Sequence, residues 1–290
     1  MTVGNGNILI DMKVLNLDEN FKPYGEGIPY QKFIFPSGCE IHIKLPDLKA
    51  VSVLITTRIQ SSDDVMLLLM ATDALRRMNV KYIEVYIPYL PYARQDRIMV
   101  YGEPFSLKVI SDMINSQNYE KVIIYDVHSD VSTALINNVE SKSNHEFVKQ
   151  ILREKENYLI VSPDAGAFKK IFNLCRAIEY KDEIVLCNKY RDVSTGNIKR
   201  IDCEIYNFKN KDLFIVDDIC DGGATFNMIA DEFRKRGTCG KINLIVSHGI
   251  FSKGLDVFPN IDNIYTTNSF CDLSPHEKLT QISLKGELLK

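Results

Sequence analysis

Short apolar runs alternate along the chain with segments of helical periodicity. Residues 51–55, 82–87 and 122–126 are runs of the length and composition typical of buried strands. Between them, residues 63–78 and 105–116 carry apolar side chains at the spacing of one helix face. The order strand, helix, strand, helix, strand predicts a parallel sheet with right-handed crossovers.

The same pattern starts again after a polar segment at 138–147. We therefore predict an α/β fold with two similar domains, 1–137 and 138–274, each a mainly parallel sheet flanked by helices, and a tail, 275–290, able to pack on the first domain. The polar, turn-rich segment 186–205 is either a mobile loop or an exposed hairpin. The elements predicted in the second domain are helices at 147–153, 167–175 and 225–236 and strands at 158–162, 213–217, 242–247 and 263–267.

The composition excludes several classes of protein. The chain has 290 residues, of which 45% are hydrophobic and 25% charged, which does not fit a disordered, collagen-like or coiled-coil protein. No apolar run is long enough to cross a membrane, and no secretory signal is visible at the start. The net charge of −3 argues against a nucleic-acid partner. The seven cysteines form no C-x-x-C pair, so we expect reduced thiols in a cytoplasmic protein.

The strongest candidate for chemistry is segment 214–226, with the sequence FIVDDICDGGATF. An apolar strand leads to Asp217 and Asp218, and Asp221 and two glycines then precede a helix near Thr225. Glycines let backbone N–H groups approach an anion, and a helix N-terminus favours negative charge. The alternative is an ordinary turn with Thr225 as the N-cap. Two adjacent carboxylates at a strand end favour the functional interpretation, because unpaired charge there is costly.

This segment resembles the motif that binds 5-phosphoribosyl 1-diphosphate (PRPP) in the type I phosphoribosyltransferase fold. The resemblance implies that the acidic pair holds ribose hydroxyls. It also implies that the following loop holds the 5-phosphate through Asp221, Gly222, Gly223, Ala224 and Thr225. Taken alone, the motif fits salvage transferases and PRPP synthetases equally well.

A second stretch distinguishes between these two groups. Segments 88–97 (PYLPYARQDR) and 102–108 (GEPFSLK) resemble the characteristic region of the ribose-phosphate pyrophosphokinases, also called PRPP synthetases. Guanidinium groups suit polyphosphate, although a solvated charged loop is the simpler interpretation of a short basic segment. The resemblance implies that ATP is contacted by Arg94, Gln95 and Arg97, with Phe35 and Glu40 near its base.

Four shorter segments match the same family in the same order: 125–128, 161–166, 189–191 and 247–252. The resemblance implies that His128 and Asp164 hold Mg²⁺, and that Lys189 and Arg191 are catalytic residues on a flexible flap. Without this context a lone histidine is more often a satisfied polar group, 189–191 is a basic hairpin tip, and 247–252 is a tight turn.

The sequence also departs from the family pattern. Gly222 stands where the family usually has a hydroxyl residue, and Cys39 is an apparent insertion in the loop 35–40. Ile98 and Met99 replace polar residues, and the N-terminus and the segment after His128 are atypical. A phosphate loop without the hydroxyl would suit a larger 5-phosphoribosyl acceptor such as ADP-ribose.

The resemblance therefore implies transfer of the β,γ-diphosphoryl group of ATP to the 1-hydroxyl of ribose 5-phosphate, with Mg²⁺, in a homo-oligomer. No Walker A sequence is present. Three alternatives stay open: the same transfer to ADP-ribose for NAD salvage, a phosphoribosyltransferase that uses a nucleobase, and a catalytically silent regulatory relative.

Overall fold

The computed structural model describes residues 12–191, 198–203 and 207–285, which divide into two compact units. The first runs to Ser143 and includes Lys285, and the second runs from Asn144 to Leu284. The boundary thus lies six residues beyond the expected one at 137 (143 − 137 = 6). Much of the expected tail belongs to the second unit, because β14 (Leu279–Ile282) pairs there with β13 (Asn263–Thr267).

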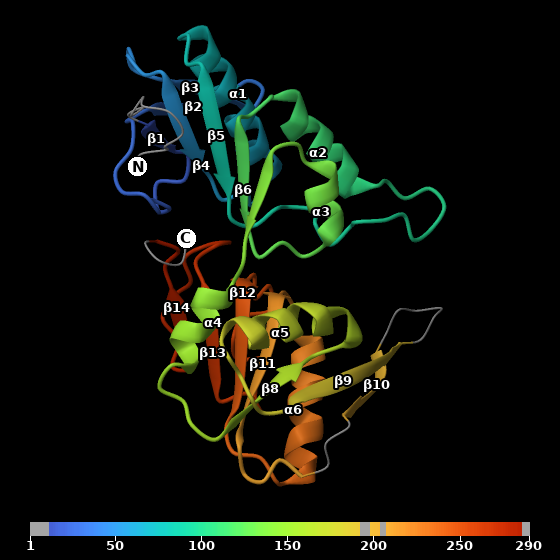
Figure 1. Cartoon of the computed structure of the whole chain (residues 1–290). Helices are drawn as coiled ribbons and strands as arrows, with labels where there is room; N and C mark the ends of the chain where they lie inside the picture. Colours follow the sequence, from blue (N-terminus) through green and yellow to red (C-terminus); the bar gives the residue numbers. More distant parts are fainter. Residues whose placement is uncertain (1–11, 192–197, 204–206, 286–290) are drawn as a thin grey trace. The chain divides into compact units, whose positions relative to one another are not determined.

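The first unit is built on a five-stranded parallel sheet in the order β1-β4-β5-β6-β7 (Figure 1). Its strands are β1 (Met12–Asn16), β4 (Ser52–Thr56), β5 (Tyr82–Ile87), β6 (Lys121–Tyr125) and β7 (Val139–Lys142). The helices are α1 (Ser62–Arg77), α2 (Ser106–Ser116) and α3 (Asp130–Leu135), and a separate hairpin consists of β2 (Gln31–Phe35) and β3 (Glu40–Lys44).

Side chains that alternate along the strands form the core of this unit. Val53 and Ile55 of β4 point to the same side as Val85 of β5, and they share a core with Leu68 of α1 and Ile110 of α2. Helix α1 begins in a capping box in which Ser61 and Asp64 satisfy each other's backbone N–H groups. The local sequence therefore fixes where this helix starts.

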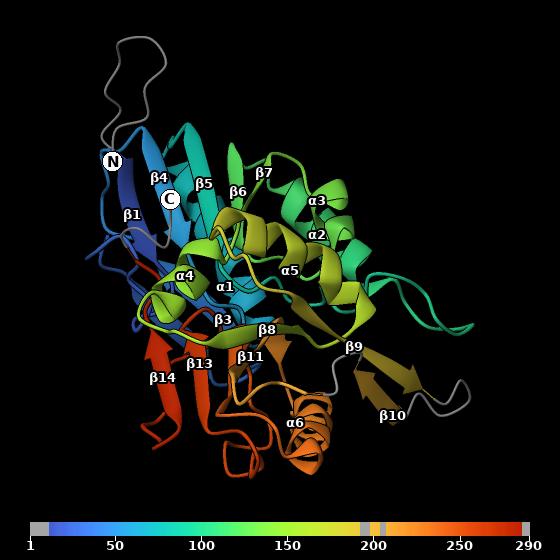
Figure 2. The same ribbon diagram turned by 60° about the horizontal axis from the view of Figure 1, so that its bottom comes forward.

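The second unit contains a seven-stranded sheet in the order β10-β9-β8-β11-β12-β13-β14. All neighbours are parallel except the edge strand β10, which runs antiparallel to β9. Helix α6 covers one face, and α4 and α5 lie on the other (Figure 2). The remaining bounds are α4 (His145–Leu152), β8 (Tyr158–Ser162), α5 (Ala165–Ala177), β9 (Ile184–Arg191), β10 (Ile198–Cys203), β11 (Asp212–Cys220), α6 (Ala224–Arg236) and β12 (Ile242–Gly249).

The α/β fold with two mainly parallel sheets is confirmed. The segment 186–205 contains the hairpin of β9 and β10, which agrees with one of its two interpretations. The strand β7 lies inside the polar segment 138–147, where no apolar run predicted a strand. No helix in the described part of the chain is long and apolar enough to cross a membrane.

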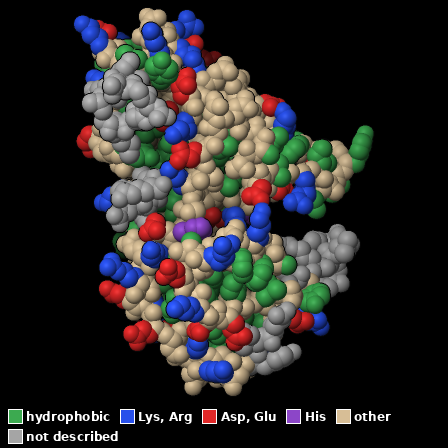
Figure 3. All heavy atoms as spheres, viewed as in Figure 1, with side chains coloured by type: hydrophobic (Ala, Val, Ile, Leu, Met, Phe, Trp, Pro, Cys, Tyr) green, Lys and Arg blue, Asp and Glu red, His purple; other side chains and the backbone are tan. Residues whose placement is uncertain are grey.

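The loop between β5 and α2 carries apolar side chains that extend into solvent (Figures 1 and 3). Ile98, Met99, Val100 and Tyr101 are all exposed, at 59%, 75%, 61% and 103%. Ile98 and Met99 are among the positions where the sequence departs from the family pattern.

Candidate active site

The order of strands in the second unit has a topological switch point between β8 and β11. After β8 the chain continues to β9, which lies on one side of the pair β8 and β11. After β11 it continues to β12, which lies on the opposite side, so the two connections diverge. In open parallel sheets such a switch point at the carboxyl ends of the strands is where ligands bind. Asp164 follows β8, and Asp221 follows β11. The topology therefore brings the loops with these predicted site residues to the same edge.

Strand β11 is longer than its neighbour β8 and carries the acidic pair beyond it. The ladder between them ends at Ile215 and Val161, whereas β11 stays paired with β12 as far as Cys220. The predicted strand ended at 217, so Asp217 and Asp218 lie within the strand and not directly after it. The regular strand fixes their backbone, which suits residues that must bind a ligand in one geometry.

Asp218 is paired with a lysine that the sequence did not single out. Its side chain is only 7% exposed, and its Oδ2 lies 3.0 Å from Nζ of Lys170 on α5. The backbone N–H of Asp218 donates to Oδ1 of Asp217 over 2.9 Å. Lys170 lies on α5, six residues beyond Asp164, and this spacing does not place the two residues on one helix face, so the sequence offered no signal for its role.

Negative charge outweighs positive charge around Asp217. Burial raises the pKa of Asp217 well above its ordinary range, and the charges of Asp218 and Asp164 raise it further. Part of this rise in pKa arises because the carboxylates lie close together with no ligand between them. The cluster is therefore suited to a divalent cation or to hydroxyl groups that donate hydrogen bonds.

Replacing Asp217 with asparagine should stabilise the fold at neutral pH. A carboxyl whose pKa is higher in the folded than in the unfolded chain costs stability as the pH rises above its ordinary pKa. We expect Asp217→Asn to raise the free energy of unfolding by on the order of 1 kcal/mol at pH 7.5, with little gain near pH 4. Urea unfolding of both proteins at the two pH values measures this. An equal gain at both would assign the effect to packing.

The loop after β11 has the geometry of an anion site. Gly223 is the N-cap of α6 with φ of 75°, and no side chain caps the helix. The first backbone N–H groups of a helix have no partner within it, so those of α6 are left for a ligand or water. Thr225 lies inside the first turn, so the alternative in which it is the N-cap is wrong.

Gly223 is required for two separate reasons. Its φ lies in the left-handed region, and a Cβ atom there would lie 2.4 Å from Cζ of Phe258. Gly237, the C-cap of the same helix, has a similar φ of 68° but no atom within 4 Å of its Cβ position. Alanine substitutions at the two glycines therefore distinguish the cost of a positive φ from the cost of a steric clash with Phe258.

We expect Gly223→Ala to destabilise the second unit by about 3 kcal/mol, and Gly237→Ala by only about 1 kcal/mol. Both variants adopt a positive φ, but only the first must displace a buried phenylalanine. Thermal or urea unfolding compares them directly. Equal losses in the two variants would show that Phe258 moves aside without cost.

A lysine occupies the space beside Gly222. A Cβ atom at Gly222 would lie 3.4 Å from Cε of Lys253, whose side chain is otherwise exposed. Segment 247–252 ends directly before Lys253, but no sequence pattern indicated that this residue reaches the loop. The methylene stem of a lysine therefore lies beside the position that lacks a hydroxyl.

Two other matched segments have mainly structural contacts. Asp164 caps α5, because its Oδ1 accepts a hydrogen bond of 3.0 Å from the N–H of Ala167. Ser247, His248 and Gly249 belong to β12, so only the second half of 247–252 can form a turn. His248 is buried and its Nδ1 lies 2.7 Å from Oγ of Ser269.

The backbones of Lys189 and Arg191 lie in β9, opposite β10. Their side chains are outside the described part of the structure, so their predicted catalytic role stays a prediction.

In the first unit, the predicted nucleotide residues lie in the loop after β5. Arg94, Gln95 and Arg97 are exposed there. The backbone of Gln95 anchors the loop: its N–H donates to the carbonyl of Tyr92, and its carbonyl accepts from the N–H of Leu107. The loop therefore has a fixed base and exposed side chains.

Asp96, which the sequence analysis did not assign, connects this loop to the residue beside His128. Its Oδ1 lies 2.8 Å from Nε of Arg97, and its Oδ2 accepts a 2.7 Å hydrogen bond from Oγ of Ser129. The hydrogen bond from Arg97 is the main cause that lowers the pKa of Asp96 to about 2. Arg97 and the segment that carries His128, which is exposed, are thereby held together.

Phe35 and Glu40 form the last residue pair of the β2–β3 hairpin, and both are exposed. Cys39 in the turn between them has φ of 51°, a conformation uncommon for residues other than glycine. The apparent insertion is thus accommodated in the hairpin turn.

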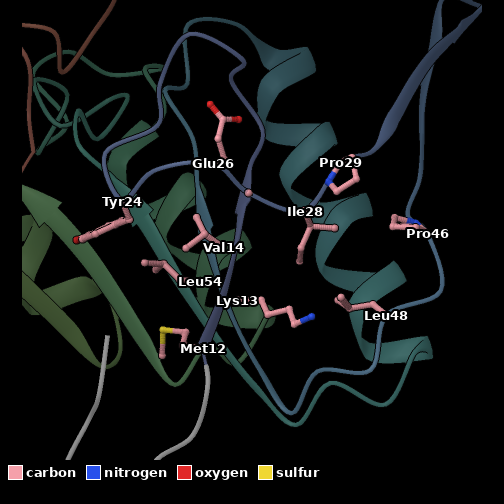
Figure 4. Close-up of a pocket in the computed structure, with 11 residues that line it drawn as sticks. Met12, Lys13, Val14, Tyr24, Glu26, Ile28, Pro29, Pro46, Leu48 and Leu54 are labelled. Atoms are coloured by element: carbon pink, nitrogen blue, oxygen red, sulfur yellow. The ribbon is translucent and has the colours of Figure 1, made fainter.

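A pocket of about 480 Å³ lies elsewhere on the first unit, against β1 and β4 (Figure 4). Tyr24, Glu26, Lys13 and Leu48 are among its lining residues, and none of the predicted site residues lines it. Within the described residues, no group of three or more His, Cys, Asp or Glu side chains is arranged to hold a metal ion.

Comparisons with known proteins found matches to both units. A model of the N-terminal domain of ribose phosphate pyrophosphokinase matches residues 42–117, and a phosphoribosyl transferase domain model matches 135–270. A ribose-phosphate pyrophosphokinase of Mycoplasmopsis pulmonis is 31% identical over 83% of this chain and 77% of its own. One from Thermococcus kodakarensis is 27% identical over 88% and 89%, respectively. For the Mycoplasma genitalium relative, at 30% identity, the match spans 72% of this chain and 64% of the relative.

Among solved structures, phosphoribosylpyrophosphate synthetase from Mycobacterium smegmatis matches with a TM-score of 0.79 at 18% identity, over 94% of both chains. At this identity the likeness establishes the fold.

Proposed function

Because this chain belongs to the ribose-phosphate pyrophosphokinase family, which consists of ATP-dependent diphosphotransferases, we propose how its own residues perform the reaction. The β,γ-diphosphoryl group of ATP is transferred to the 1-hydroxyl of ribose 5-phosphate, which gives PRPP and AMP. The acidic pair on β11, directly before a glycine-rich helix start, is the observation that carries this proposal.

In the second unit, Asp217 and Asp218 accept hydrogen bonds from the ribose hydroxyls. The loop from Asp221 to Thr225 binds the 5-phosphate through the backbone N–H groups at the start of α6. Lys170 acts as a positioning residue, because its ion pair holds the Asp218 carboxylate in place. Lys189 and Arg191 supply positive charge to the diphosphoryl group during transfer.

In the first unit, Arg94, Gln95 and Arg97 bind ATP, with Phe35 and Glu40 near the base. The Asp96 carboxylate fixes one orientation of Arg97, which lowers the entropy lost when its guanidinium meets a phosphate. Binding and charge neutralisation account for most of the rate in phosphoryl-type chemistry, so no covalent intermediate with the protein is needed.

Mg²⁺ is the expected metal, because carboxylate oxygens are its usual protein ligands and it commonly keeps substrate phosphates and water as the rest. His128 would contribute a ligand to the ion bound with ATP, and Asp164 would contribute a ligand to a second ion. The charges of Asp218 and Asp164 raise the pKa of Asp217, so a cation beside them would relieve this repulsion. Because the described residues contain no group of three or more such side chains arranged to hold a metal ion, substrate oxygens and water would have to complete its coordination. When bound, the ion neutralises charge on the diphosphoryl oxygens.

Ribose 5-phosphate is the preferred acceptor over ADP-ribose. A monoester carries more charge at its terminal phosphate than a diester does. The stem of Lys253 lies against Gly222, so its ammonium group can turn toward a phosphate bound in the loop. The comparisons likewise name ribose phosphate as the acceptor of the relatives. The missing hydroxyl is therefore compensated by charge.

Two wider proposals rest on single observations. The seven cysteines are all free thiols, which supports a reducing, cytoplasmic location.

Exposed Phe33, Ile34 and Phe35 on the β2–β3 hairpin support self-association into a homo-oligomer.

A coupled assay for AMP tests the reaction. We expect Mg²⁺-dependent AMP release with ATP and ribose 5-phosphate, abolished by a chelator, and at least about tenfold slower release with ADP-ribose. Faster turnover of ADP-ribose would reverse the choice of acceptor. No AMP with either compound in the presence of Mg²⁺ would overturn the enzymatic function.

A further inference from the structure

Two buried cysteines face each other across the β9–β10 hairpin. Cys187 of β9 and Cys203 of β10 are direct partners in the antiparallel register, and their Sγ atoms lie 2.9 Å apart. Their side chains are 0% and 4% exposed. Each thiol therefore has the other as its neighbour, and neither is used in the proposed reaction.

The backbone is already in position for a covalent link. Opposite residues of antiparallel strands have Cα atoms about 4.5–5.5 Å apart. A disulfide requires a Cα separation of about 4.4–6.8 Å. Only the sulfur atoms have to approach each other, and the ladder on either side of the pair can stay intact.

The two thiols differ in their surroundings, which favours one of them as the nucleophile. Either thiol can donate the hydrogen bond to the other, and the positive charge of Arg236 on α6 favours the thiolate form of both. Nη1 of Arg236 also donates to the carbonyl of Cys203 over 3.3 Å. The contact of Arg236 with the Cys203 residue therefore favours Cys203 as the nucleophile.

Access to the pair is possible because β10 is an edge strand. It has only β9 as a ladder partner, so local opening exposes Cys203 without unfolding of the sheet. A small neutral oxidant can enter through such an opening more easily than a bulky one.

We propose that Cys187 and Cys203 are an oxidative modification site that hydrogen peroxide converts to a reversible disulfide. The Cys203 thiolate attacks one peroxide oxygen, the O–O bond breaks, and a sulfenic acid forms with release of water after protonation. The sulfur of Cys187 then attacks the Cys203 sulfur, the S–O bond breaks, and a second water leaves. Two thiols lose two electrons and two protons in total, and peroxide is reduced to two water molecules.

The link also bears on catalysis, and this part rests on the proposed function. Lys189 lies two residues beyond Cys187 on the same strand, directly opposite Ile201. A covalent tie at Cys187 restricts the twist and displacement of β9 at that point. We expect the disulfide to reduce the rate of transfer and to leave ATP binding unchanged.

Peptide mapping of the full-length protein tests the site without any assay of activity. Trypsin cleaves after Lys181, Lys189, Arg200 and Lys209, so a disulfide would join peptides 182–189 and 201–209. After treatment with peroxide we expect this linked pair in non-reducing digests, and its loss after dithiothreitol. Cys187→Ala must abolish it, whereas Cys175→Ala, which removes another buried cysteine of the same unit, must not.

In the same samples, the kcat of the wild-type protein should fall about tenfold on oxidation and recover on reduction. The kcat of Cys203→Ala should be the same before and after treatment with peroxide. Absence of the linked peptides in oxidised wild-type protein overturns the modification site. Linked peptides with an unchanged kcat overturn the effect on catalysis. Failure of the proposed function would instead appear as absence of AMP formation by the fully reduced protein, so the two ideas fail separately.

Discussion

Replacing Lys189 with alanine should lower kcat by about 10²–10³-fold while the KM values for ATP and ribose 5-phosphate change by less than about threefold. The ammonium group is proposed to stabilise charge that develops on the diphosphoryl group during transfer. Such an interaction exists only in the transition state, so its loss reduces kcat and not ground-state binding. Steady-state measurement of AMP release over both substrate concentrations separates the two parameters.

Lys181→Ala is the matched control, because this exposed lysine lies just before β9 and has no proposed contact with substrate. It should keep kcat within about twofold. Lys189→Arg keeps the charge and should recover part of the lost rate. An alanine variant at 189 with full kcat would remove this lysine from the mechanism and leave Arg191 as the only candidate on the strand.

The second large effect is expected at Asp218. Asp218→Asn removes the charge that Lys170 and the ribose hydroxyls share, although the side-chain volume hardly changes. The Asp218 carboxylate is buried although Lys170 is 39% exposed, so removing its charge is expected to cost about 2–3 kcal/mol, near the low end of the range for buried pairs. We therefore expect kcat/KM for ribose 5-phosphate to fall by about 10²-fold or more, with the affinity for ATP preserved. Steady-state kinetics and binding of ATP by calorimetry measure the two quantities.

The pair of Asp182 and Lys211 provides a control with the same chemistry at the surface of the same unit. Its oxygen and nitrogen are 2.5 Å apart, but Asp182 is 51% exposed. Exposed pairs contribute little, so Asp182→Asn should change kcat/KM by less than about twofold. A similar loss in both variants would mean that Asp218 affects the general stability of the unit and has no specific contact with the sugar.

The sequence predicted the α/β class well because both sheets are buried on two faces. Strands such as β5 and β8 are therefore continuous apolar runs at their predicted positions, 82–87 and 158–162. Strands β7 and β14 were missed because their side chains are half-buried or exposed, so no apolar period marks them. The hairpin β2–β3 was missed for the same reason, since every residue of β2 is exposed.

The candidate site was predicted in its sequence motifs but not in its supporting contacts. Asp217 and Asp218 were found because adjacent carboxylates next to a glycine-rich turn are unusual. Lys170, Lys253 and Asp96 act through contacts between segments far apart in the chain, such as the ion pair from α5 to β11. The spacing of residues along the chain carries no information about these side-chain contacts. They become visible only in the folded structure.

The antiparallel edge strand of the second unit has a consequence for solubility. On β10, Arg200 pairs with Asp202 over 2.6 Å and also lies 4.8 Å from the ring centroid of Tyr190. Charged side chains on an outer strand prevent another sheet from adding to it. A chain that lost β10 would present the parallel strand β9 as a bare edge, open to pairing with a neighbouring molecule. The hairpin that carries Lys189 therefore also protects the enzyme from aggregation, so deletions there would be counter-selected even where catalysis is not needed.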